Sequence, residues 1–232
     1  MPKCEKCKGI LIPIDGKLRC ENFPIRCDFQ IENPKPNVNK CEYIVFDFET
    51  TGTGQKDRVI EVAAVKVING VVVSEYQSLV NPGIFIKQNI VDLTGITNEM
   101  LVKARPSEEV MPEFMEWCGT TFDYVVGHNA ATFDCRFLKK ELKIVSEHRR
   151  MQGQTQIPYT FKTLVDTLRV AKDIFPIKKG QMSVLPNHKQ PTLAQYYGIH
   201  YNAHRALDDV KALQKIYVEL CKENDKDYRI FL

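Results

Sequence analysis

The hydrophobic pattern is clearest at residues 43–52, where aromatic and β-branched side chains form a nearly continuous run that ends at Gly52. A run of this kind, closed by a turn residue, predicts a buried strand. Residues 58–68 and 71–79 have the same character, and the Asn69-Gly70 dipeptide between them strongly favours a tight hairpin turn. The three segments therefore predict an antiparallel meander.

The remaining pattern mixes helical periodicity with one short apolar strand at residues 122–126. Val110, Phe114 and Trp117 recur at helical spacing after Ser107, which is a good capping residue. Short helical turns are expected within residues 88–101. Further helices are expected over residues 107–118, 131–142, 161–175 and 192–197. The segment 203–210 is expected to lead into a last helix that ends near residue 224. Polar residues 146–158 and 178–190 predict loops. The whole predicts an α/β fold, a mixed sheet flanked by helices.

The N-terminal residues follow a different pattern, in which cysteines are more regular than apolar side chains. The spacing is Cys-x-x-Cys, twelve residues, and then a second pair, formed by Cys4, Cys7, Cys20 and Cys27. Four thiolates are the ligand set of a structural Zn²⁺, although two disulfides or free thiols are the alternative. Residues 10–14 and 17–20 also predict a hairpin, as in a zinc ribbon. Residues 20–29 resemble the small four-cysteine fingers of bacterial type I topoisomerases.

Composition divides the chain but does not reveal its function. We predict a zinc ribbon at residues 1–32, a Pro/Asn-rich linker at 33–40 and a larger domain at 41–232. The 232 residues are 44% apolar and 26% charged, as in ordinary soluble proteins, and no apolar run approaches the ~20 residues of a membrane span. A cytoplasmic protein without membrane attachment is expected. The net charge of +3 does not by itself indicate nucleic-acid binding.

Several acidic residues occupy positions where buried elements should be apolar. Asp47 and Glu49 are two residues apart on the first predicted strand, so their side chains share one face and repel each other. Asp134 lies near the start of a helix that follows a strand, and Asp209 shares a helix face with apolar residues. Taken singly, these acids could be a solvated strand face, a helix cap and a partnered carboxylate.

A divalent metal site explains the four acids together. Two cations about 4 Å apart require several carboxylate ligands, and they can activate water for attack on a phosphodiester. His204 precedes Asp209 by five residues. Its ordinary pKa lies near neutrality, so it could be the general base of such a reaction, although a single histidine is more often a surface or core residue.

Three motifs in order resemble those of the DnaQ-like DEDDh exonucleases in the ribonuclease H-like superfamily, the type of the proofreading ε subunit of bacterial DNA polymerase III. They are Phe-Asp-Phe-Glu-Thr-Thr-Gly at 46–52, His-Asn through Phe-Asp at 128–134, and His-Arg-Ala-Leu-Asp-Asp at 204–209. The resemblance covers residues 40–222. It implies a ribonuclease H-like fold and a metal-dependent 3′–5′ exonuclease of DNA replication or repair. Such an enzyme hydrolyses single-stranded or frayed DNA from the 3′ end and releases nucleoside 5′-monophosphates.

The resemblance also implies roles for individual residues. Two Mg²⁺ or Mn²⁺ ions would be bound by Asp47, Glu49, Asp134 and Asp209, with His204 as the general base. The residues expected at the substrate are Thr50, Thr51, His128, Asn129 and Phe133.

Alternatives remain open for substrate and partners. The same superfamily includes 3′–5′ exoribonucleases, and a non-catalytic nucleic-acid-binding module is a third possibility. A DNA polymerase is a possible partner. Residues 181–185 resemble the short glutamine-led peptides that dock on bacterial sliding clamps, so a clamp is a second possible partner; an ordinary loop is the simpler interpretation.

Overall fold

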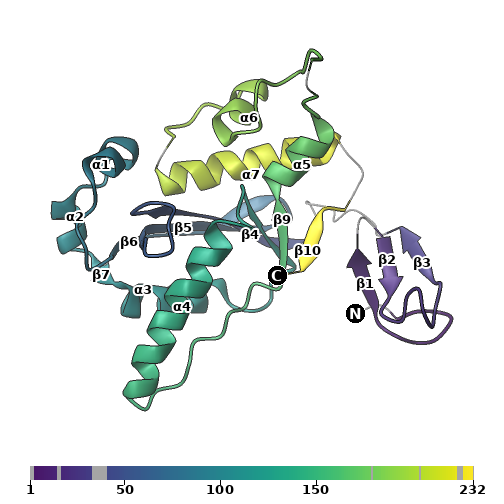
Figure 1. The fold of residues 1–232 in the computed structure, drawn as a ribbon, viewed down its shortest axis with the longest axis horizontal. Coiled ribbons are helices and arrows are strands. Elements are labelled where there is room, and N and C mark those ends of the chain that lie inside the picture. The colour runs from purple at the N-terminus through teal and green to yellow at the C-terminus, as the bar shows by residue number, and fades with distance from the viewer. Residues whose placement is uncertain are drawn as a thin grey trace.

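The computed structural model describes residues 3–14, 17–32, 41–178, 180–203, 205–223 and 227–231, which form two separate sheets. The small antiparallel sheet contains β1 (Leu11–Ile14), β2 (Lys17–Cys20) and β3 (Gln30–Glu32). The large sheet has the order β10-β9-β8-β4-β5-β6-β7 (Figure 1). Its strands are β4 (Glu42–Thr50), β5 (Val59–Ile68), β6 (Val71–Asn81), β7 (Arg105–Pro106), β8 (Tyr124–Gly127), β9 (Thr163–Asp166) and β10 (Arg229–Phe231).

The large sheet is mixed, as the sequence predicted. Strands β4, β5 and β6 form the antiparallel meander, whereas β8 runs parallel to β4 and β9 runs parallel to β8. Asn69 and Gly70 have φ values of 52° and 81° in the turn between β5 and β6. Two consecutive positive φ values are typical of a type I′ hairpin, which explains why this dipeptide is found there.

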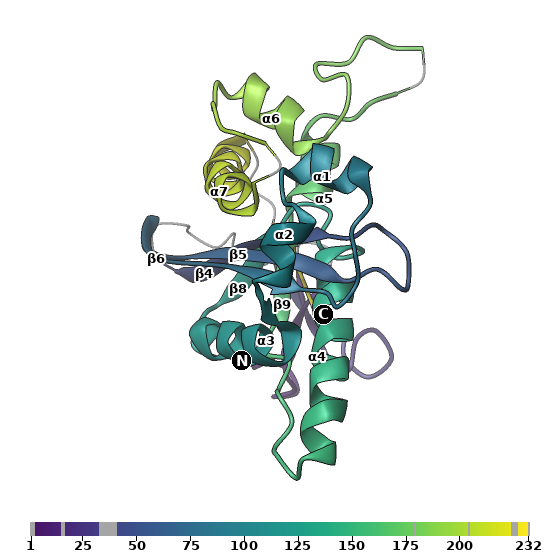
Figure 2. The same cartoon turned by 90° about the vertical axis from the view of Figure 1, so that its left-hand side faces the viewer.

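Helices cover both faces of the large sheet. They are α1 (Gln88–Thr94), α2 (Asn98–Val102), α3 (Ser107–Cys118), α4 (Asp134–Met151), α5 (Thr167–Ile174), α6 (Gln190–Tyr196) and α7 (Ala206–Glu223). Helices α3 and α4 lie on one face, and α5, α6 and α7 lie on the other (Figure 2). None of the helices in the described ranges combines the length and hydrophobicity that a membrane crossing requires.

The alternation of side chains along β4 assigns its residues to the two helical layers. Ile44, Phe46 and Phe48 belong to the core beneath α3 and α4, whereas Tyr43 and Val45 belong to the core beneath α7. Because side chains alternate along a strand, the next odd-numbered residues, 47 and 49, also face the α7 side. Because of this alternation, the side chains of Asp47 and Glu49 both point toward α7, the helix that carries Asp209.

Helix α4 is longer than its sequence pattern predicted. The expected end was near residue 142, with a loop from 146, but the helix continues to Met151. Fully buried Val145 extends the apolar stripe of Leu138 and Leu142 by another turn. The polar residues that suggested a loop lie on the solvent-facing side of this extension.

The expected helix at residues 161–175 is instead a strand followed by a shorter helix. Leu164 and Val165 in β9 are both buried, but they belong to the cores on opposite faces of the sheet. Consecutive apolar residues are typical of a strand covered on both faces, and here they were mistaken for a helical stripe. Helix α5 begins only after Asp166, whose side chain accepts a hydrogen bond from the Leu168 N–H at 3.1 Å.

Ser107 does not cap α3 as predicted. It is the first residue of the helix, it is buried, and its hydroxyl lies 2.8 Å from Glu141 Oε2 on α4. Glu141 is fully buried and also accepts hydrogen bonds from Arg58 at 2.7 and 2.8 Å. This network ties the start of α3 and the middle of α4 to the start of β5.

Candidate active site

Three predicted acids meet at the C-terminal end of β4. Carboxylate oxygens of Asp47, Glu49 and Asp209 all lie within 4.8 Å of one another. Asp209 comes from the first turn of α7, where its Oδ2 accepts a hydrogen bond from the Arg205 N–H at 3.1 Å. Gln190 at the start of α6 donates to both the backbone oxygen and Oδ1 of Asp209, at 2.9 and 3.1 Å.

Asp134 reaches the same strand from the opposite helical layer. It is the first residue of α4 and is 2% exposed. Its Oδ1 accepts a hydrogen bond from the Phe48 N–H at 3.1 Å. Because Phe48 stands between Asp47 and Glu49, this bond places Asp134 beside the other acids. The structure thus brings together all four acids that the sequence singled out.

Burial and mutual repulsion make this cluster costly to ionise. Burial raises the pKa of Asp47 well above its usual range, and the neighbouring charges of Asp134, Glu49 and Asp209 raise it further. Burial, followed by the charge of Asp209, raises the pKa of Glu49 to about 8. Burial also raises the pKa of Asp134 to about 7.

The donor set fits a divalent cation. Carboxylate oxygens are the ligands that Mg²⁺ and Mn²⁺ prefer, and a bound cation favours the charged form of each acid. Without a cation, Asp47, Glu49 and Asp134 hold their protons more tightly than free carboxylic acids, because burial raises the pKa of Asp47 and raises those of Glu49 and Asp134 to about 8 and about 7.

A fifth acid, which the sequence analysis missed, supports the cluster. Glu61 on β5 stands opposite Glu49 in the strand register and is 1% exposed. It accepts hydrogen bonds from Gln77 Nε2 at 2.8 Å and from the Ala206 N–H at 3.3 Å. It therefore ties β5 to the start of α7, close to Asp209. The signal was present in the sequence, as a single acid within the apolar run 59–65.

A pocket of about 450 Å³ opens beside the acids. Its lining includes Asp47, Glu49, Asp209, His128, Asn129, Leu168, Lys172, His188, Lys189 and Gln190. Burial lowers the pKa of His128 to about 4, so its imidazole is neutral at physiological pH. Its Nδ1 lies 2.9 Å from Thr167 Oγ1, which fixes the ring at the start of α5. Two of the predicted substrate residues, His128 and Asn129, therefore line the pocket.

Asp166 shapes this side of the pocket and was also missed. It is buried, and its carboxylate accepts hydrogen bonds from the N–H groups of Asn129 and Ala131 at 2.9 and 3.0 Å. Asn129 has a φ of 62°, in the left-handed region. Asp166 thus holds the turn between β8 and α4 in an uncommon conformation, although the sequence pattern assigned it to a helix.

The other predicted substrate residues are not among the pocket lining. The Thr50 hydroxyl donates to the Gly52 oxygen at 2.7 Å, and the Thr51 hydroxyl donates to Asp57 Oδ1 at 2.8 Å. Both hydroxyls thereby support the turn that follows β4. The Phe133 ring packs against Phe137 with centroids 5.0 Å apart. His204, the predicted general base, lies outside the described residues.

The four N-terminal cysteines form a second compact cluster, with ligand atoms within 4.8 Å of one another. The Sγ–Sγ distances are 3.6 Å for Cys4–Cys27 and 3.3 Å for Cys7–Cys20, far longer than a disulfide bond. Tetrahedral Zn–S bonds of ~2.3 Å would place the sulfurs about 3.8 Å apart. A backbone hydrogen bond from Gly9 lowers the pKa of Cys7 to about 6, whereas burial raises the pKa of Cys20 to about 12, so the zinc fit rests on the sulfur geometry. These cysteines fit a Zn²⁺ ion.

The close approach of the chain at this cluster explains Gly9. A Cβ at this position would lie 3.0 Å from the side chains of Asn22 and Glu21 and 3.2 Å from Cys20 Sγ. A larger residue would therefore displace the side chains around the sulfurs.

Comparison with known proteins identifies the family. The sequence profile of the exonuclease family (RNase_T) matches residues 44–217. DNA polymerase III subunit epsilon of Aquifex aeolicus (strain VF5) is 32% identical over 192 residues, which cover 82% of this chain and 85% of the relative. DNA polymerase III PolC-type of Clostridium perfringens (strain 13 / Type A) is 36% identical over 210 residues, which cover 89% of this chain and 13% of that polymerase.

Solved structures share the fold at lower identity. The nuclease domain of 3′hExo, a DEDDh family member bound to rAMP, has a TM-score of 0.62 at 19% identity and covers 85% of this chain and 98% of that chain. E. coli Exonuclease I in complex with a dA16 oligonucleotide has a TM-score of 0.62 at 20% identity, over 80% and 42% of the two chains. Exonuclease X in complex with 5′ overhanging duplex DNA has a TM-score of 0.57 at 20% identity, over 80% and 95%.

The family profile covers most of the chain, and the epsilon subunit aligns over most of its own length. The chain belongs to the exonuclease (RNase_T) family and carries a hydrolytic 3′–5′ exonuclease domain related to that of DNA polymerase III.

Proposed function

We propose that the protein removes nucleotides from the 3′ end of single-stranded or frayed DNA, in proofreading or repair, and releases nucleoside 5′-monophosphates. The observation that carries this proposal is the cluster of Asp47, Glu49, Asp134 and Asp209 beside an open pocket in an exonuclease-family fold. Complexes of Exonuclease X and Exonuclease I with DNA support DNA as the substrate.

In this proposal the four acids hold two Mg²⁺ or Mn²⁺ ions. Bound ions would supply electrostatic stabilisation of the phosphodiester and a water of lowered pKa. Gln190 orients the Asp209 carboxylate, and Glu61 fixes the start of α7, so the ligands keep their positions without the ions. His204 is proposed to accept the proton of the attacking water.

The terminal nucleotide is proposed to occupy the pocket beside the acids. Neutral His128 and the Asn129 side chain would face the sugar or base, and Lys172 and Lys189 contribute positive charge at the same pocket. Thr50 and Thr51 contribute to this site through the turn that they stabilise, because their hydroxyls are engaged within it.

A DNA polymerase is the partner that the relatives favour, since both compared sequences are DNA polymerase III proteins. A sliding clamp is supported less well. In the segment 181–185, Met182 is fully exposed, but Leu185 is 3% exposed and belongs to the core beneath α7. Docking of this segment on a clamp would have to remove Leu185 from that core.

The cysteine cluster is proposed to be a structural Zn²⁺ site in a module of residues 1–32, joined through residues 33–40 to the exonuclease domain at 41–232. A reducing, intracellular compartment would keep the four thiols available. Purified protein should contain one zinc per chain by elemental analysis, and Cys20→Ser should lower the zinc content. Limited proteolysis should cleave first within residues 33–40. Full zinc content in Cys20→Ser would contradict the ligand assignment.

Degradation of 5′-labelled single-stranded DNA and RNA of identical sequence tests the activity. Each substrate should be incubated with Mg²⁺, with Mn²⁺ and without added divalent metal, and Asp209→Asn is the control variant. We expect a metal-dependent ladder on DNA that the variant does not produce. A ladder on RNA alone would establish an exoribonuclease instead, and the absence of cleavage on both would indicate a binding module.

A further inference from the structure

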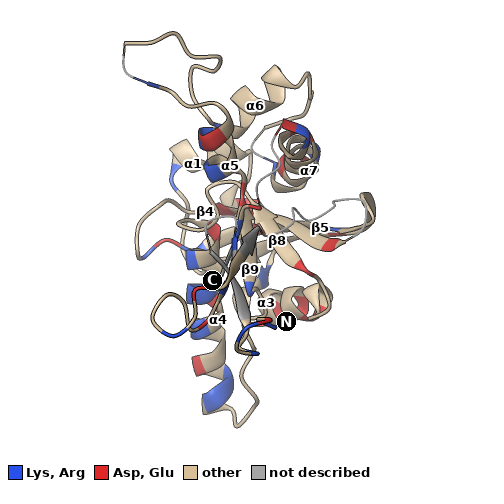
Figure 3. Cartoon of the chain, turned by 90° about the vertical axis from the view of Figure 1, so that its right-hand side faces the viewer, with Lys and Arg blue, Asp and Glu red and all other residues tan. Residues whose placement is uncertain are grey.

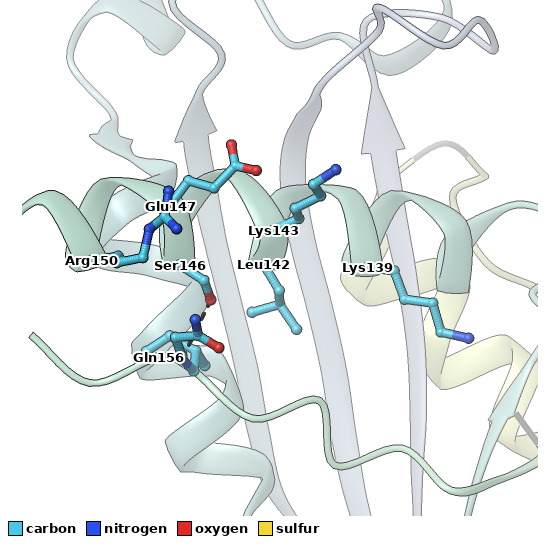
Figure 4. A pocket seen from close by; sticks show the side chains of 8 residues that line it. Lys139, Leu142, Lys143, Ser146, Glu147, Arg150 and Gln156 are labelled. Carbon is cyan, nitrogen blue, oxygen red and sulfur yellow. Dashed lines mark hydrogen bonds between the residues drawn. The ribbon is translucent and has the colours of Figure 1, made fainter.

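A second pocket, of about 400 Å³, lies along α4, outside the acid cluster. It is lined by Lys139, Leu142, Lys143, Ser146, Glu147, Arg150, Gln156 and Ile157. In Figure 4, Leu142 and Ser146 point from the helix toward the segment that carries Gln156, and the three basic side chains are spread along the helix around them. The Ile157 N–H donates to Ser146 Oγ at 3.4 Å, so this segment is held against the helix.

The pocket is basic. Lys139, Lys143 and Arg150 are exposed, and Glu147 is the single acid in the lining. Among the described residues, no ion pair joins Lys143 or Arg150 to a carboxylate. Lys139 Nζ lies 4.9 Å from the centre of the Tyr159 ring. The cations are therefore available to an anionic ligand.

Basic residues lie on α4 between this pocket and Asp134, the member of the acid cluster that α4 carries. Arg136 is exposed and Lys140 partly so, and each donates to a backbone oxygen of the turn after β4, on Thr53 and Asp57 respectively. The acceptors of both side chains are backbone oxygens, so these hydrogen bonds do not neutralise their positive charge. Figure 3 shows basic segments along α4 and at its far end. A strand that leaves the acids in this direction would meet positive charge along the whole helix.

The distance along α4 sets the length of such a strand. Lys143 and Arg150 follow Asp134 by 9 and 16 residues, or about 13 and 24 Å at the helical rise of about 1.5 Å per residue. For a single strand whose bases stay stacked as in B-form DNA, at about 3.4 Å per nucleotide, this span corresponds to about 4–7 nucleotides.

We propose that the α4 pocket binds the phosphate backbone of the substrate strand, about 4–7 nucleotides from the 3′ end. This proposal rests on the proposed function and names a second contact for the same substrate. The spacing of the cations along the helix suits a chain of phosphates better than a single small anion. The lining also contains the apolar side chains of Leu142 and Ile157, which offer a surface to sugar or base. Contacts of this kind position a strand without reading its sequence.

The test compares substrates that do and do not reach the pocket. The double variant Lys143→Gln/Arg150→Gln should be assayed on a dinucleotide and on a 12-nucleotide single strand, with Lys103→Gln as a control for an exposed lysine elsewhere. The dinucleotide should be hydrolysed at the wild-type rate, because it occupies only the acid cluster. For the 12-nucleotide strand, KM should rise by about tenfold with kcat unchanged, since lost phosphate contacts weaken binding.

Two further readouts make the result specific. The slope of log KM against log salt should fall by about 1.4, because each single-strand phosphate contact contributes about 0.7. Glu147→Gln should act in the opposite direction and lower KM for the long strand, because it removes the single negative charge of the pocket.

Wild-type KM and an unchanged salt slope in the double variant would overturn the proposal. If wild-type protein cleaves neither substrate, the proposed function fails. Fluorescence anisotropy with the labelled 12-nucleotide strand, measured without Mg²⁺, then tests the pocket alone. The double variant should bind the strand more weakly than the wild type, and Glu147→Gln should bind it more tightly. Unchanged DNA binding together with lost binding of an acidic peptide would reassign the pocket to a protein partner.

Discussion

The carboxylate repulsion within the acid cluster leads to a prediction that joins stability and activity. Asp47→Asn replaces an ionisable carboxyl, whose oxygens lie within 4.8 Å of those of Glu49 and Asp209, by a neutral amide of similar volume. We expect this variant to be inactive with Mg²⁺, because it lacks a ligand. In buffer without Mg²⁺ or Mn²⁺, we expect it to be more stable than the wild type.

The magnitude follows from the distances. Two unit charges 4.8 Å apart repel by about 3.5 kcal/mol at an effective dielectric constant of about 20. Asp47 has two such neighbours, but the repulsion is only partly developed near neutral pH, because burial raises the pKa of Asp47 itself and the pKa of Glu49 is raised to about 8. The expected gain in unfolding free energy at pH 8.5 is therefore about 2–4 kcal/mol.

The gain should depend on pH in a defined direction. Glu49 has a higher pKa in the folded protein than in the unfolded chain, where it is about 4.3. Its contribution to stability is present below pH 4 and is lost as the pH rises toward about 8. The advantage of Asp47→Asn should thus be small at pH 5 and largest at pH 8.5.

Urea unfolding at pH 5 and 8.5, with and without Mg²⁺, measures this difference. Asp208→Asn is the matched control, because Asp208 neighbours Asp209 on α7 without belonging to the cluster. Saturating Mg²⁺ should reverse the order of stability, since the wild type binds the ion more tightly. A variant that is less stable than wild type at pH 8.5 without metal, or one that cleaves DNA, would refute the reasoning.

Three further predictions concern the surroundings of the cluster. Glu141→Ala should lower the unfolding free energy by about 3–5 kcal/mol in urea, because Arg58 loses a buried partner; a loss below about 1 kcal/mol would contradict this. Gln190→Ala should raise the half-saturating Mg²⁺ concentration for cleavage by about 10-fold, since Asp209 loses a donor; an unchanged Mg²⁺ titration would argue against that role. The half-saturating Mg²⁺ concentration of the wild type should fall from pH 6 to 8.5, because Mg²⁺ must displace protons from Glu49; a flat profile would exclude this competition.

The sequence predicted those features that depend on strong local periodicity. The meander of β4, β5 and β6 has long apolar runs and an Asn-Gly turn, so both its strands and its connection were correctly predicted. Asp47, Glu49 and Asp209 could be found because they interrupt apolar patterns, whereas Asp134 was found from its place at the start of a helix that follows a strand. Their meeting at one place could not be derived from spacing, because it depends on helices from both sides of the sheet.

Errors arose where a residue has its partner far away in the chain. Asp166 was assigned to a helix, although its partners are backbone groups of Asn129 and Ala131 in a distant turn. Ser107 was assigned as a helix cap, but its hydroxyl contacts Glu141, 34 residues later.

The meeting of both helical layers at β4 has a consequence during protein synthesis. Asp134 reaches the strand from the α3/α4 side, whereas Asp209 reaches it from α7 on the other side. A ribosome-bound chain lacks Asp209 until residues 206–223 have emerged, and a folding intermediate with only one layer lacks one of the two acids. Neither can assemble the full ligand set. The proposed nuclease activity therefore requires both helical layers to be folded onto β4.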